Sequence, residues 1–573
     1  MPSRRRWPVS AAPPVPRSGE ARSTPPGRAL SLGSLQAACE TGWEGRAILW
    51  KAVPLCLAAL PFGAGVARAL LARGGIWLWG DQAVIDLEAR DSLLGRNLLG
   101  VYDRYGWHHP GPLWLLWLGI VRWVGGGAPE ALVVGSFVLQ GTFAVAIVLF
   151  ASRLQPGRMV PWLTAIAVVA YEWDFGPGRF GTVWAPYAIT LPAALLVLVV
   201  VDAVTNDDPW PGAFGSVLCA SFLVQTDIGT GVLVAGLCLF ALVLGSFGGF
   251  AQLRVGRWRL RAGVLGAVAV MAWMPPLVQQ LASDPGNLGL VFRFFTTHSS
   301  HRSWHESLRV VSTLFGTYPL QRGPHGANVD AALTWLAARP VLRRPWYLLY
   351  LLGTLAAGAF ALSRGRRKAA ALAAACVVSL LAAAWSVHLA DGDLYPYIVV
   401  WMAALAVPAW VSMALAFAPG LGVRALRLGR SIVPAVALAV SAAVTVGFAA
   451  SPSPMGGTPS QLGRLSWEAV SPAVLSPGVR TIYVDIAANE GMPEAAAIAD
   501  NAVRRGRRVE VNGQALYFFD PSFAARAPAQ VKIVVCCGKG DPGRPPPGVT
   551  FGAQVGGQAI YLSRVAVRAK ASS

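Results

Sequence analysis

Charged residues are scarce in this chain of 573 residues: Asp, Glu, Lys and Arg together make up 13% of it. An ordinary soluble domain has about twice that share. The shortage argues against a soluble enzyme, because too little charge is present to cover a surface that faces water. Cysteine is also sparse, with seven residues, which excludes a disulfide scaffold. Hydrophobic residues make up 54%, so the composition favours a helical protein with several membrane spans.

Acidic residues are the scarcer charge type, since 28 Asp and Glu stand against 48 Lys and Arg, giving a formal net charge of +20. In a soluble protein this excess would suggest nucleic acid. In a membrane protein it has a simpler origin, because cytoplasmic loops collect Lys and Arg. We therefore expect no nucleic-acid partner. The sequence also lacks a Gly-Lys-Ser/Thr phosphate loop, a Gly-x-Ser-x-Gly elbow and a His-Glu-x-x-His zinc motif.

Apolar runs recur up to about residue 450 and predict eleven spans, since a span needs about 20 apolar residues. Most Arg-rich loops then fall on the same side as the N-terminus, which is predicted to be cytoplasmic. Loop 203–212 fits this pattern least, because it has two Asp and no basic residue. We expect a multi-pass protein of the cell membrane. The predicted spans are 52–72, 130–152, 159–172, 184–202, 213–225, 228–247, 263–280, 346–363, 369–388, 396–417 and 431–450.

Segment 111–124 is apolar but short, and it carries Arg122 among several Trp residues. Trp and Arg both suit the boundary between lipid and water. We therefore expect a helix that lies at the outer surface rather than an additional span. The first outer loop then covers 73–129, and a second long outer loop covers 281–345.

The two ends of the chain differ from its middle. Residues 1–48 are rich in Pro, Ser and Arg without apolar periodicity, which predicts a disordered basic cytoplasmic tail. The segment SPSPMGGTPS at 451–460 is typical of a linker. Beyond it, a helical stretch at 493–505 among short β-like runs predicts a small α/β domain outside the membrane. The β-like runs are 480–486, 531–537 and 558–563.

The expected fold class is therefore an all-α polytopic membrane protein, with about 11 transmembrane helices and a small C-terminal extracytoplasmic α/β domain. The expected divisions are the tail 1–48, the membrane domain 49–450 and the C-terminal domain 451–573.

The first outer loop contains the most unusual segment, WGDQAVIDLEARDSLLGRNLLGVYDRYGWHHPGPLWLLWL. Val84, Leu87, Leu94 and Leu98 are spaced to share one helical face. This spacing predicts an amphipathic helix on the bilayer surface, with Asp81 at its N-terminus. Asp81 then has two interpretations: it caps the helix, a role that Asp favours, or it is a catalytic carboxylate at the lipid boundary.

The string GDQA, followed by HHPGPLWLLW, resembles membrane glycosyltransferases of the C-type fold. Protein O-mannosyltransferases, lipid A aminoarabinose transferases and actinobacterial arabinosyltransferases share surface helices and an acidic residue in the first outer loop. The resemblance covers roughly residues 50–450. Eleven spans with long loops after the first and seventh also match the O-mannosyltransferase layout. The chain departs from the pattern at Gln82, where these families usually have Glu.

The resemblance implies inverting sugar transfer from a polyprenyl-phosphate donor to a cell-envelope glycan, glycolipid or protein acceptor. An acceptor hydroxyl needs a base within hydrogen-bond reach, and Asp81 matches that position. The charge that develops on the departing lipid phosphate needs cationic donors. The predicted donor-binding residues are Arg104, His108, His109 and Arg179, and the predicted acceptor-binding or supporting residues are Asp86, Glu88, Asp174, Asp227 and His388.

Several of these residues have a second interpretation. His108 and His109 can be interfacial packing residues beside Trp107. Asp227 interrupts an apolar run, and a polar residue at membrane depth is costly, which favours a function over an ordinary loop role. Some relatives use a divalent cation such as Mg²⁺ or Mn²⁺ near the first-loop carboxylate, and Asp81 with Asp227 could hold one here.

Three His residues in HSSHRSWHE, namely His298, His301 and His305, have helical spacing that would allow a zinc site. An interfacial or acceptor-facing helix is the favoured interpretation of this segment. The C-terminal domain is expected to bind or orient the acceptor, or else to act as a lid or an assembly surface.

Two other functions remain open. A transporter or flippase of lipid-linked glycans would have internal repeats with paired broken helices, and no such repeat is evident in the sequence. A non-catalytic scaffold of the same fold stays open because of Gln82.

Overall fold

The structure is a computed structural model in which the chain divides into two units, Met1–Trp50 and Lys51–Ser573. Every contact discussed below lies within the second unit. The residues that the structure describes are 32–72, 74–155, 159–247, 258–297, 301–316, 346–392, 394–417, 423–487, 489–519, 521–526, 528–536 and 550–563.

Helix α1 (Leu32–Leu71) begins inside the segment 1–48 that the sequence suggested to be a disordered tail. Residues 32–48 are therefore helical, whereas residues 1–31 lie outside the described part of the chain.

All eleven predicted spans are helical, and the prediction of a polytopic helical protein is confirmed. Eight helices in the described part of the chain are long and apolar enough to cross a membrane. The other three predicted spans correspond to shorter apolar helices: α5 (Val160–Phe175), α9 (Trp210–Thr226) and the apolar part of α15 (Trp346–Ser363). The remaining helices of this group are α4 (Pro129–Leu154), α8 (Thr190–Thr205), α10 (Gly231–Ser246), α11 (Trp258–Ala282), α16 (Arg367–His388), α18 (Ala406–Phe417) and α19 (Val423–Ala450).

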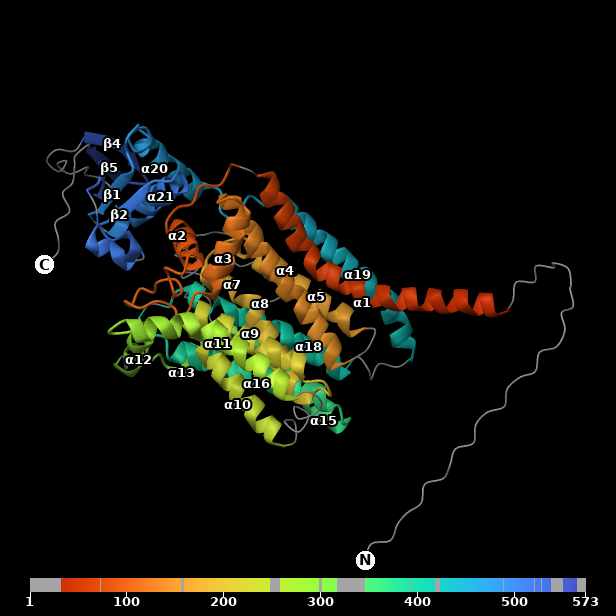
Figure 1. Cartoon of the computed structure of the whole chain (residues 1–573). Coiled ribbons are helices and arrows are strands. Elements are labelled where there is room, and N and C mark those ends of the chain that lie inside the picture. The colour runs from red at the N-terminus through yellow and green to blue at the C-terminus, as the bar shows by residue number, and fades with distance from the viewer. Residues whose placement is uncertain are drawn as a thin grey trace, which may run out of the picture. The chain divides into compact units, whose positions relative to one another are not determined.

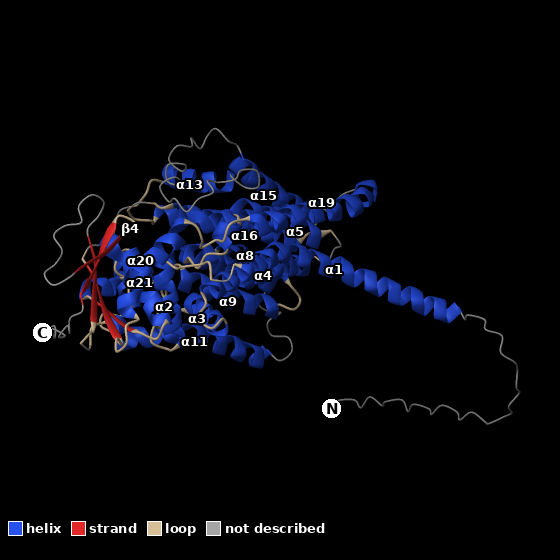
Figure 2. Cartoon of the chain, turned by 90° about the horizontal axis from the view of Figure 1, so that it is seen from above, coloured by secondary structure: helices blue, strands red, loops and turns tan. Residues whose placement is uncertain are grey.

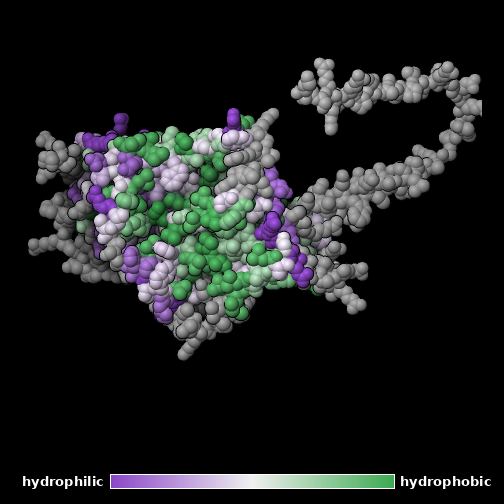
Figure 3. All heavy atoms as spheres, turned by 90° about the horizontal axis from the view of Figure 1, so that it is seen from below, coloured by the Kyte–Doolittle hydropathy of each residue, from purple (hydrophilic) through white to green (hydrophobic). Residues whose placement is uncertain are grey.

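Helix α8 is the centre of the bundle, and it packs against α4, α9, α10, α16 and α18 (Figure 1). Its sequence TLPAALLVLVVVDAVT is apolar on every side, so it has no face suited to solvent. Nearly all of its residues are buried. Helices α10 and α11 instead expose large apolar side chains, as expected of lipid-facing helices. Figure 3 shows a hydrophobic surface over the bundle, bordered by hydrophilic residues.

Two short helices follow α1 in the predicted first outer loop. Helix α2 (Asp81–Leu93) packs against α3 (Leu113–Val124), and α3 packs against α4. The predicted helix at 111–124 is thus present with only 12 residues, too few to cross a bilayer. The second predicted outer loop contains α12 (Asn287–Thr297) and α13 (Trp304–Gly316).

The C-terminal region contains a five-stranded sheet with strand order β2-β1-β3-β5-β4. Strand β1 pairs in parallel with β2 and β3, whereas β5 pairs antiparallel with β3 and β4. Figure 2 shows the sheet at one end of the helical unit. The elements are α20 (Thr458–Val474), β1 (Thr481–Ile486), α21 (Met492–Arg504), β2 (Arg508–Val511), β3 (Val531–Cys536), β4 (Thr550–Val555) and β5 (Gln558–Ser563).

The expected α/β region is confirmed, with two differences from the sequence prediction. Helix α20 begins at Thr458, inside the segment interpreted as a linker. Strands β2 and β4 were not predicted, because β2 has only four residues and β4 contains Gly552.

The prediction of an amphipathic surface helix at Asp81 is wrong in one respect. Nine of the 13 residues of α2 are buried, including the acidic residues of its polar side. The reason is that α21 packs on α2 from the C-terminal region. The helix also ends at Leu93, so Leu94 and Leu98 do not extend the apolar face formed by Val84 and Leu87.

Candidate active site around Asp81

Asp81 is the first residue of α2, and Gly80 before it is the N-cap. Gly80 has φ of 59°, a left-handed conformation that favours glycine. The structure records no side-chain cap at this helix. The Asp81 carboxylate instead accepts a hydrogen bond of 2.6 Å from the Tyr102 hydroxyl and a second one from the side chain of Trp184. The structure therefore does not support the capping interpretation of Asp81.

The electrostatic setting of Asp81 differs from that of an ion pair. Burial raises the pKa of the Asp81 carboxyl above its usual value, and the hydrogen bonds from Tyr102 and Trp184 offset only part of this rise. Among the described residues no cation forms an ion pair with it. A partly buried carboxylate held by neutral donors keeps an increased affinity for a proton, which is the property that a general base requires.

Tyr102 reaches Asp81 because it lies in a short hairpin. Tyr102 and His108 form an antiparallel bridge, and the amide of Asp103 donates to the carbonyl of Trp107 at 2.8 Å. Gly106 makes the turn with φ of 87°, a conformation that a residue with a side chain rarely adopts. The hairpin therefore fixes Tyr102 beside the start of α2, together with Asp103. Burial raises the pKa of Asp103 to about 6.

Arg104 is the cation nearest to Tyr102 in the same hairpin. Its guanidinium lies 4.8 Å from the ring centroids of both Tyr105 and Tyr395. It also donates a hydrogen bond of 2.7 Å to the Tyr105 hydroxyl and one of 3.4 Å to the carbonyl of Asp391. The two rings hold the guanidinium in a defined position, as a fixed positive charge at the predicted phosphate end of the site.

Aromatic side chains connect Arg104 with the donors around Asp81. Trp184 lies 4.6 Å from Tyr397, and Tyr397 stacks on Tyr395 at 5.5 Å between centroids. These side chains come from the segment before α8 and the segment before α18, which meet because both helices pack together in the bundle. The aromatic row gives the candidate site one continuous wall from the carboxylate to the guanidinium.

Arg179 contacts the same row from the side of α5. It donates a hydrogen bond to the hydroxyl of Tyr187, whose ring lies 5.4 Å from Trp184. Asp174 at the end of α5 is close enough to Arg179 for electrostatic attraction. Arg179 is thus joined to Asp81 through Tyr187 and Trp184, although it makes no recorded ion pair with the carboxylate.

The two predicted His residues differ in their surroundings. The backbone of His108 is held by Asn287 of α12, whose side chain bonds both its amide and its carbonyl at 2.8 Å. The His109 ring is buried, and its Nδ1 accepts a hydrogen bond of 3.3 Å from the amide of Ile228. Burial, with a contribution from His108, lowers the pKa of His109 to about 3. His109 is therefore uncharged and supplies no positive charge for a phosphate.

Asp227 lies at the turn between α9 and α10, where its carboxylate accepts a hydrogen bond of 2.8 Å from the amide of Gly229. Burial raises the pKa of Asp227 to about 7, and the negative charge of Asp103 adds to the rise. Asp227 is thus an electrostatic neighbour of Asp103, and the pairing with Asp81 that the sequence suggested is not recorded.

The sequence suggested two metal sites, a zinc site at three His residues and a divalent-cation site at Asp81 and Asp227. No group of three or more His, Cys, Asp or Glu side chains that could hold a metal ion occurs in the described part of the chain. His298 of the suggested zinc motif lies outside that part. His301 stacks on His388 at 5.2 Å, and His388 stacks on Trp304 at 4.5 Å. The divalent cation remains a prediction from the family resemblance.

Three predicted supporting residues have other surroundings. Asp86 is fully buried and accepts hydrogen bonds from Arg122 at 2.9 Å, and it forms an ion pair of 2.8 Å with Arg504. Glu88 is also buried in α2. His388 is held through its Nδ1, which lies 2.5 Å from the carbonyl of Arg302.

Sequence reasoning missed the aromatic partners of the carboxylate. Tyr102 stands within the unusual loop segment, so its position was a usable signal. No sequence signal marked Trp184, Tyr395 and Tyr397, because aromatic residues are common along the whole chain and the partners of these three are far away in sequence.

No protein-family model and no curated protein sequence matches this chain. Among solved structures, the crystal structure of ArnT from Cupriavidus metallidurans in the apo state matches with a TM-score of 0.50 at 16% identity, over 92% of this chain and 99% of that chain. The archaeal oligosaccharyltransferase AglB from Archaeoglobus fulgidus, in complex with an inhibitory peptide and a dolichol-phosphate, matches with a TM-score of 0.34 at 13% identity, over 78% of this chain and 63% of that chain. The likeness to ArnT spans nearly the whole of both chains, and the resemblance to the C-type fold is confirmed as a fold.

Proposed function

We propose that this multi-pass membrane protein of the C-type fold is a glycosyltransferase that moves a sugar from a polyprenyl-phosphate donor to a cell-envelope acceptor. The observation that carries the proposal is the Asp81 carboxylate, which is partly buried and bonded by the neutral side chains of Tyr102 and Trp184. The fold likeness to ArnT, a lipid A aminoarabinose transferase, supports the same class of reaction.

In this reaction Asp81 takes the proton of an acceptor hydroxyl as the hydroxyl oxygen attacks the anomeric carbon of the sugar. The bond between that carbon and the phosphate oxygen breaks, and polyprenyl phosphate leaves with the electron pair. A single displacement of this kind inverts the anomeric centre. The raised pKa of Asp81 suits the step, because a higher pKa makes the carboxylate a stronger acceptor for the proton of the hydroxyl.

Arg104 is the residue proposed to stabilise the phosphate charge that develops as the bond breaks. Its guanidinium is already oriented by Tyr105 and Tyr395, so little rearrangement is needed during the reaction. His108 and Arg179 remain proposed neighbours of the donor. A resident divalent cation, if the protein binds one, would neutralise phosphate charge beside Asp103 and Asp227, whose carboxylates are close enough to influence each other.

The C-terminal region is proposed to orient the acceptor over the same site. Phe518 meets the ring of Tyr102 edge to face at 5.4 Å, and the carbonyl of Pro493 accepts a hydrogen bond of 3.2 Å from the amide of Gly80. The region therefore contacts both the hydrogen-bond donor of Asp81 and the residue before it. A change of position in this region would be transmitted to the base.

The proposed orientation has the N-terminus in the cytoplasm and the C-terminal region outside the cell. Exposed Gly513 and exposed Asp207 would then lie on opposite sides of the membrane. A membrane-impermeant thiol reagent applied to intact cells should modify Gly513→Cys and leave Asp207→Cys unmodified, with the unsubstituted protein as control. The reverse labelling pattern would contradict the orientation and the side of the active site.

The function itself is tested with purified protein in lipid nanodiscs. A panel of polyprenyl-phosphate sugars is supplied together with a cell-envelope lipid and glycan extract. Release of polyprenyl phosphate and appearance of labelled sugar in the extract are measured. We expect turnover of at least one donor. Binding of donors without turnover of any of them, by protein that is folded, would instead favour the non-catalytic scaffold, and movement of intact donor across the bilayer would favour a flippase.

A further inference from the structure

A cavity of about 370 Å³ lies where α2, α3 and α21 meet, at the other end of α2 from Asp81. Each of the three elements contributes one guanidinium to its lining: Arg90 from α2, Arg122 from α3 and Arg504 from α21. None of the described residues that line it is acidic. Arg90 is nine residues after Asp81, which corresponds to about 14 Å along a helix axis. The cavity is therefore separate from the candidate active site.

The acidic partners of these arginines lie behind the cavity wall. Asp86 is fully buried and serves both Arg122 and Arg504, at 2.9 and 2.8 Å. Asp500 also contacts Arg504 at 2.9 Å and forms a hydrogen bond with Asp86. Burial, with the repulsion of Asp86 added to it, raises the pKa of Asp500 well above its usual value despite the attraction of Arg504. Both guanidiniums are therefore directed toward Asp86, behind the wall of the cavity.

Arg90, the third arginine of the lining, also has an acidic partner that does not line the cavity. Arg90 pairs with Asp91 at 3.4 Å, and Arg96 approaches the same carboxylate at 3.9 Å. Asp91 is itself buried and also accepts a hydrogen bond of 2.9 Å from Ser522. Glu130 is within electrostatic range of Arg504, but one of its carboxylate oxygens accepts a hydrogen bond of 2.7 Å from the Gly74 amide. The carboxylates that pair with the three lining arginines thus all lie outside the lining, so the wall itself is cationic and suits an anion.

The mouth of the cavity is apolar on one side. Leu94 and Trp123 line it, with 54% and 74% of their surfaces exposed. Ile120 and Val124 continue this exposed face of α3, whereas the opposite face packs inside the protein. Exposed Trp and aliphatic side chains next to Arg are typical of the boundary between lipid and water. The cavity thus combines cations in its wall with an apolar surface at its opening.

We propose that this cavity binds the phosphate group of a membrane lipid, with the apolar part of the lipid lying on Leu94 and Trp123. Guanidinium groups suit this ligand, because their planar donors can bond two phosphate oxygens at once. The volume is within the range of small-ligand sites and fits a headgroup rather than a whole lipid. The binding site does not depend on the proposed glycosyltransferase activity, since it uses none of the residues around Asp81.

The test uses the full-length protein purified in detergent and native mass spectrometry. The probes are dioleoyl phosphatidic acid, dioleoylglycerol and inorganic phosphate. Phosphatidic acid has both features of the proposed ligand, whereas each of the other two has only one. We expect one tightly bound copy of phosphatidic acid and at least tenfold weaker binding of dioleoylglycerol. Equally tight binding of inorganic phosphate would overturn the lipid assignment in favour of a free anion, and equally tight binding of dioleoylglycerol would overturn the role of the arginines.

Two matched pairs of variants locate the bound lipid. Arg90→Gln should weaken phosphatidic acid binding about tenfold, because it removes a charged donor from the wall. Arg96→Gln is its control: Arg96 contacts the same Asp91 but does not line the cavity. Leu94→Glu should abolish binding by placing a negative charge at the exposed mouth, whereas Leu94→Gln should retain it within about threefold. Equal affinities in Arg90→Gln and Arg96→Gln, or in Leu94→Glu and Leu94→Gln, would overturn the proposal.

Discussion

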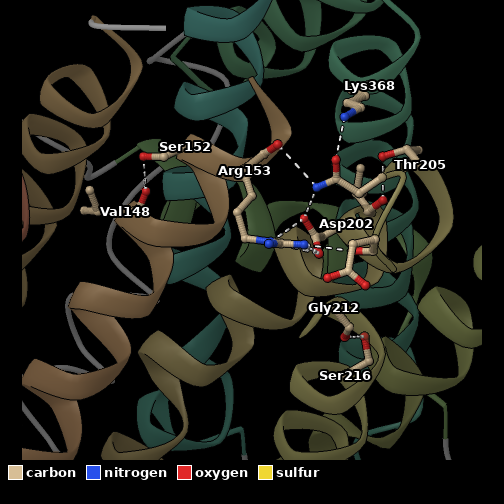
Figure 4. Close-up of polar contacts among 11 residues, drawn as sticks. Val148, Ser152, Arg153, Asp202, Thr205, Gly212, Ser216 and Lys368 are labelled. Atoms are coloured by element: carbon tan, nitrogen blue, oxygen red, sulfur yellow. Dashed lines mark hydrogen bonds and ion pairs between the residues drawn. The ribbon is translucent and has the colours of Figure 1, made fainter. Parts of the chain in front are cut away.

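Polar clusters lie near the two ends of α8, and they are built in different ways. At the carboxyl end Asp202 is fully buried and accepts hydrogen bonds from Arg153, with Nε at 3.1 Å (Figure 4). Asn206 bonds the same carboxylate and accepts a hydrogen bond of 2.5 Å from Lys368. Before the amino end, Asp81 has only neutral donors around its carboxylate.

The difference separates a structural acid from an acid that is available for chemistry. The cationic partners of Asp202 connect the elements that form its cluster, here α4, α8 and α16. The partly buried Asp81 carboxylate, with neutral donors, has a raised proton affinity and can take up a proton during a reaction. Burial of an acid alone therefore does not indicate function, and Asp81 differs from Asp202 in having no cationic partner among the described residues.

The Arg153 cluster also accounts for the loop that fitted the charge pattern least. Loop 203–212 has Asp207 and Asp208 but no basic residue of its own. Arg153 donates to the carbonyl of Asp208 at 2.9 Å, and Lys368 reaches the adjoining Asn206. Positive charge is thus supplied by neighbouring helices, which a count along the sequence does not detect.

The largest effect is expected at Asp81. Asp81→Asn removes the proton acceptor while keeping the size of the side chain, so sugar transfer should fall by about 100- to 10,000-fold. Transfer is measured in nanodiscs, together with donor binding and the thermal unfolding midpoint, which should both change little. Transfer within a few-fold of the unsubstituted protein would place the base elsewhere. Asp81 would then not differ from Asp202 in having a chemical role.

The control for that variant is chosen from the structure. Asp86 and Asp91 are on the same helix, but both are buried in ion pairs, so replacing either would disturb folding as well as charge. Glu490→Gln is more suitable, because Glu490 is exposed in the C-terminal region. It removes one carboxylate and should leave transfer unchanged.

A large effect on stability is expected at the carboxyl end of α8, where Arg153 pairs with Asp202. Arg153→Met leaves the Asp202 carboxylate buried without its main partner, which should cost about 3–5 kcal/mol of stability. The double variant Arg153→Met with Asp202→Asn should recover part of the loss, since no unpaired charge remains. Unfolding midpoints of the single and double variants are compared. Equal midpoints for Arg153→Met and the unsubstituted protein would show that the pair is not an anchor.

The sequence was informative where the signal is local. Apolar runs located the helices of the bundle, and the unusual loop segment located Asp81. The sequence could not show that α2 is buried, because the cover comes from α21, some 400 residues away along the chain. It could not show either that Asp86 lies away from the site, because its partner Arg504 is on α21 and is equally distant along the chain.

A moderate effect is expected for Tyr102→Phe, which keeps the ring and its contact with Phe518 but removes the hydrogen bond to Asp81. That bond favours the ionised carboxylate and lowers its pKa, so its loss raises the pKa of Asp81 further. Fewer molecules then have the ionised base at a given pH. The acid limb of the pH–rate profile should move to higher pH, with transfer at neutral pH lower by about three- to tenfold. A profile that falls uniformly without moving would contradict the role of Asp81 as the titrating base.

The smallest effect is expected at an exposed ion pair near the Arg153 cluster. Arg261 and Asp208 lie 3.4 Å apart, but their side chains are 48% and 58% exposed. Water screens this attraction, so Arg261→Gln should lower stability by no more than about 0.5 kcal/mol, and raising the salt concentration should reduce the difference further. The measurement is the same thermal unfolding midpoint as for Arg153→Met, at low and high salt. Arg261→Gln could instead destabilise the protein as much as Arg153→Met does. Burial of the ion pair would then not explain the stabilising role of the Asp202 cluster. The net charge at this end of the bundle would have to account for both effects.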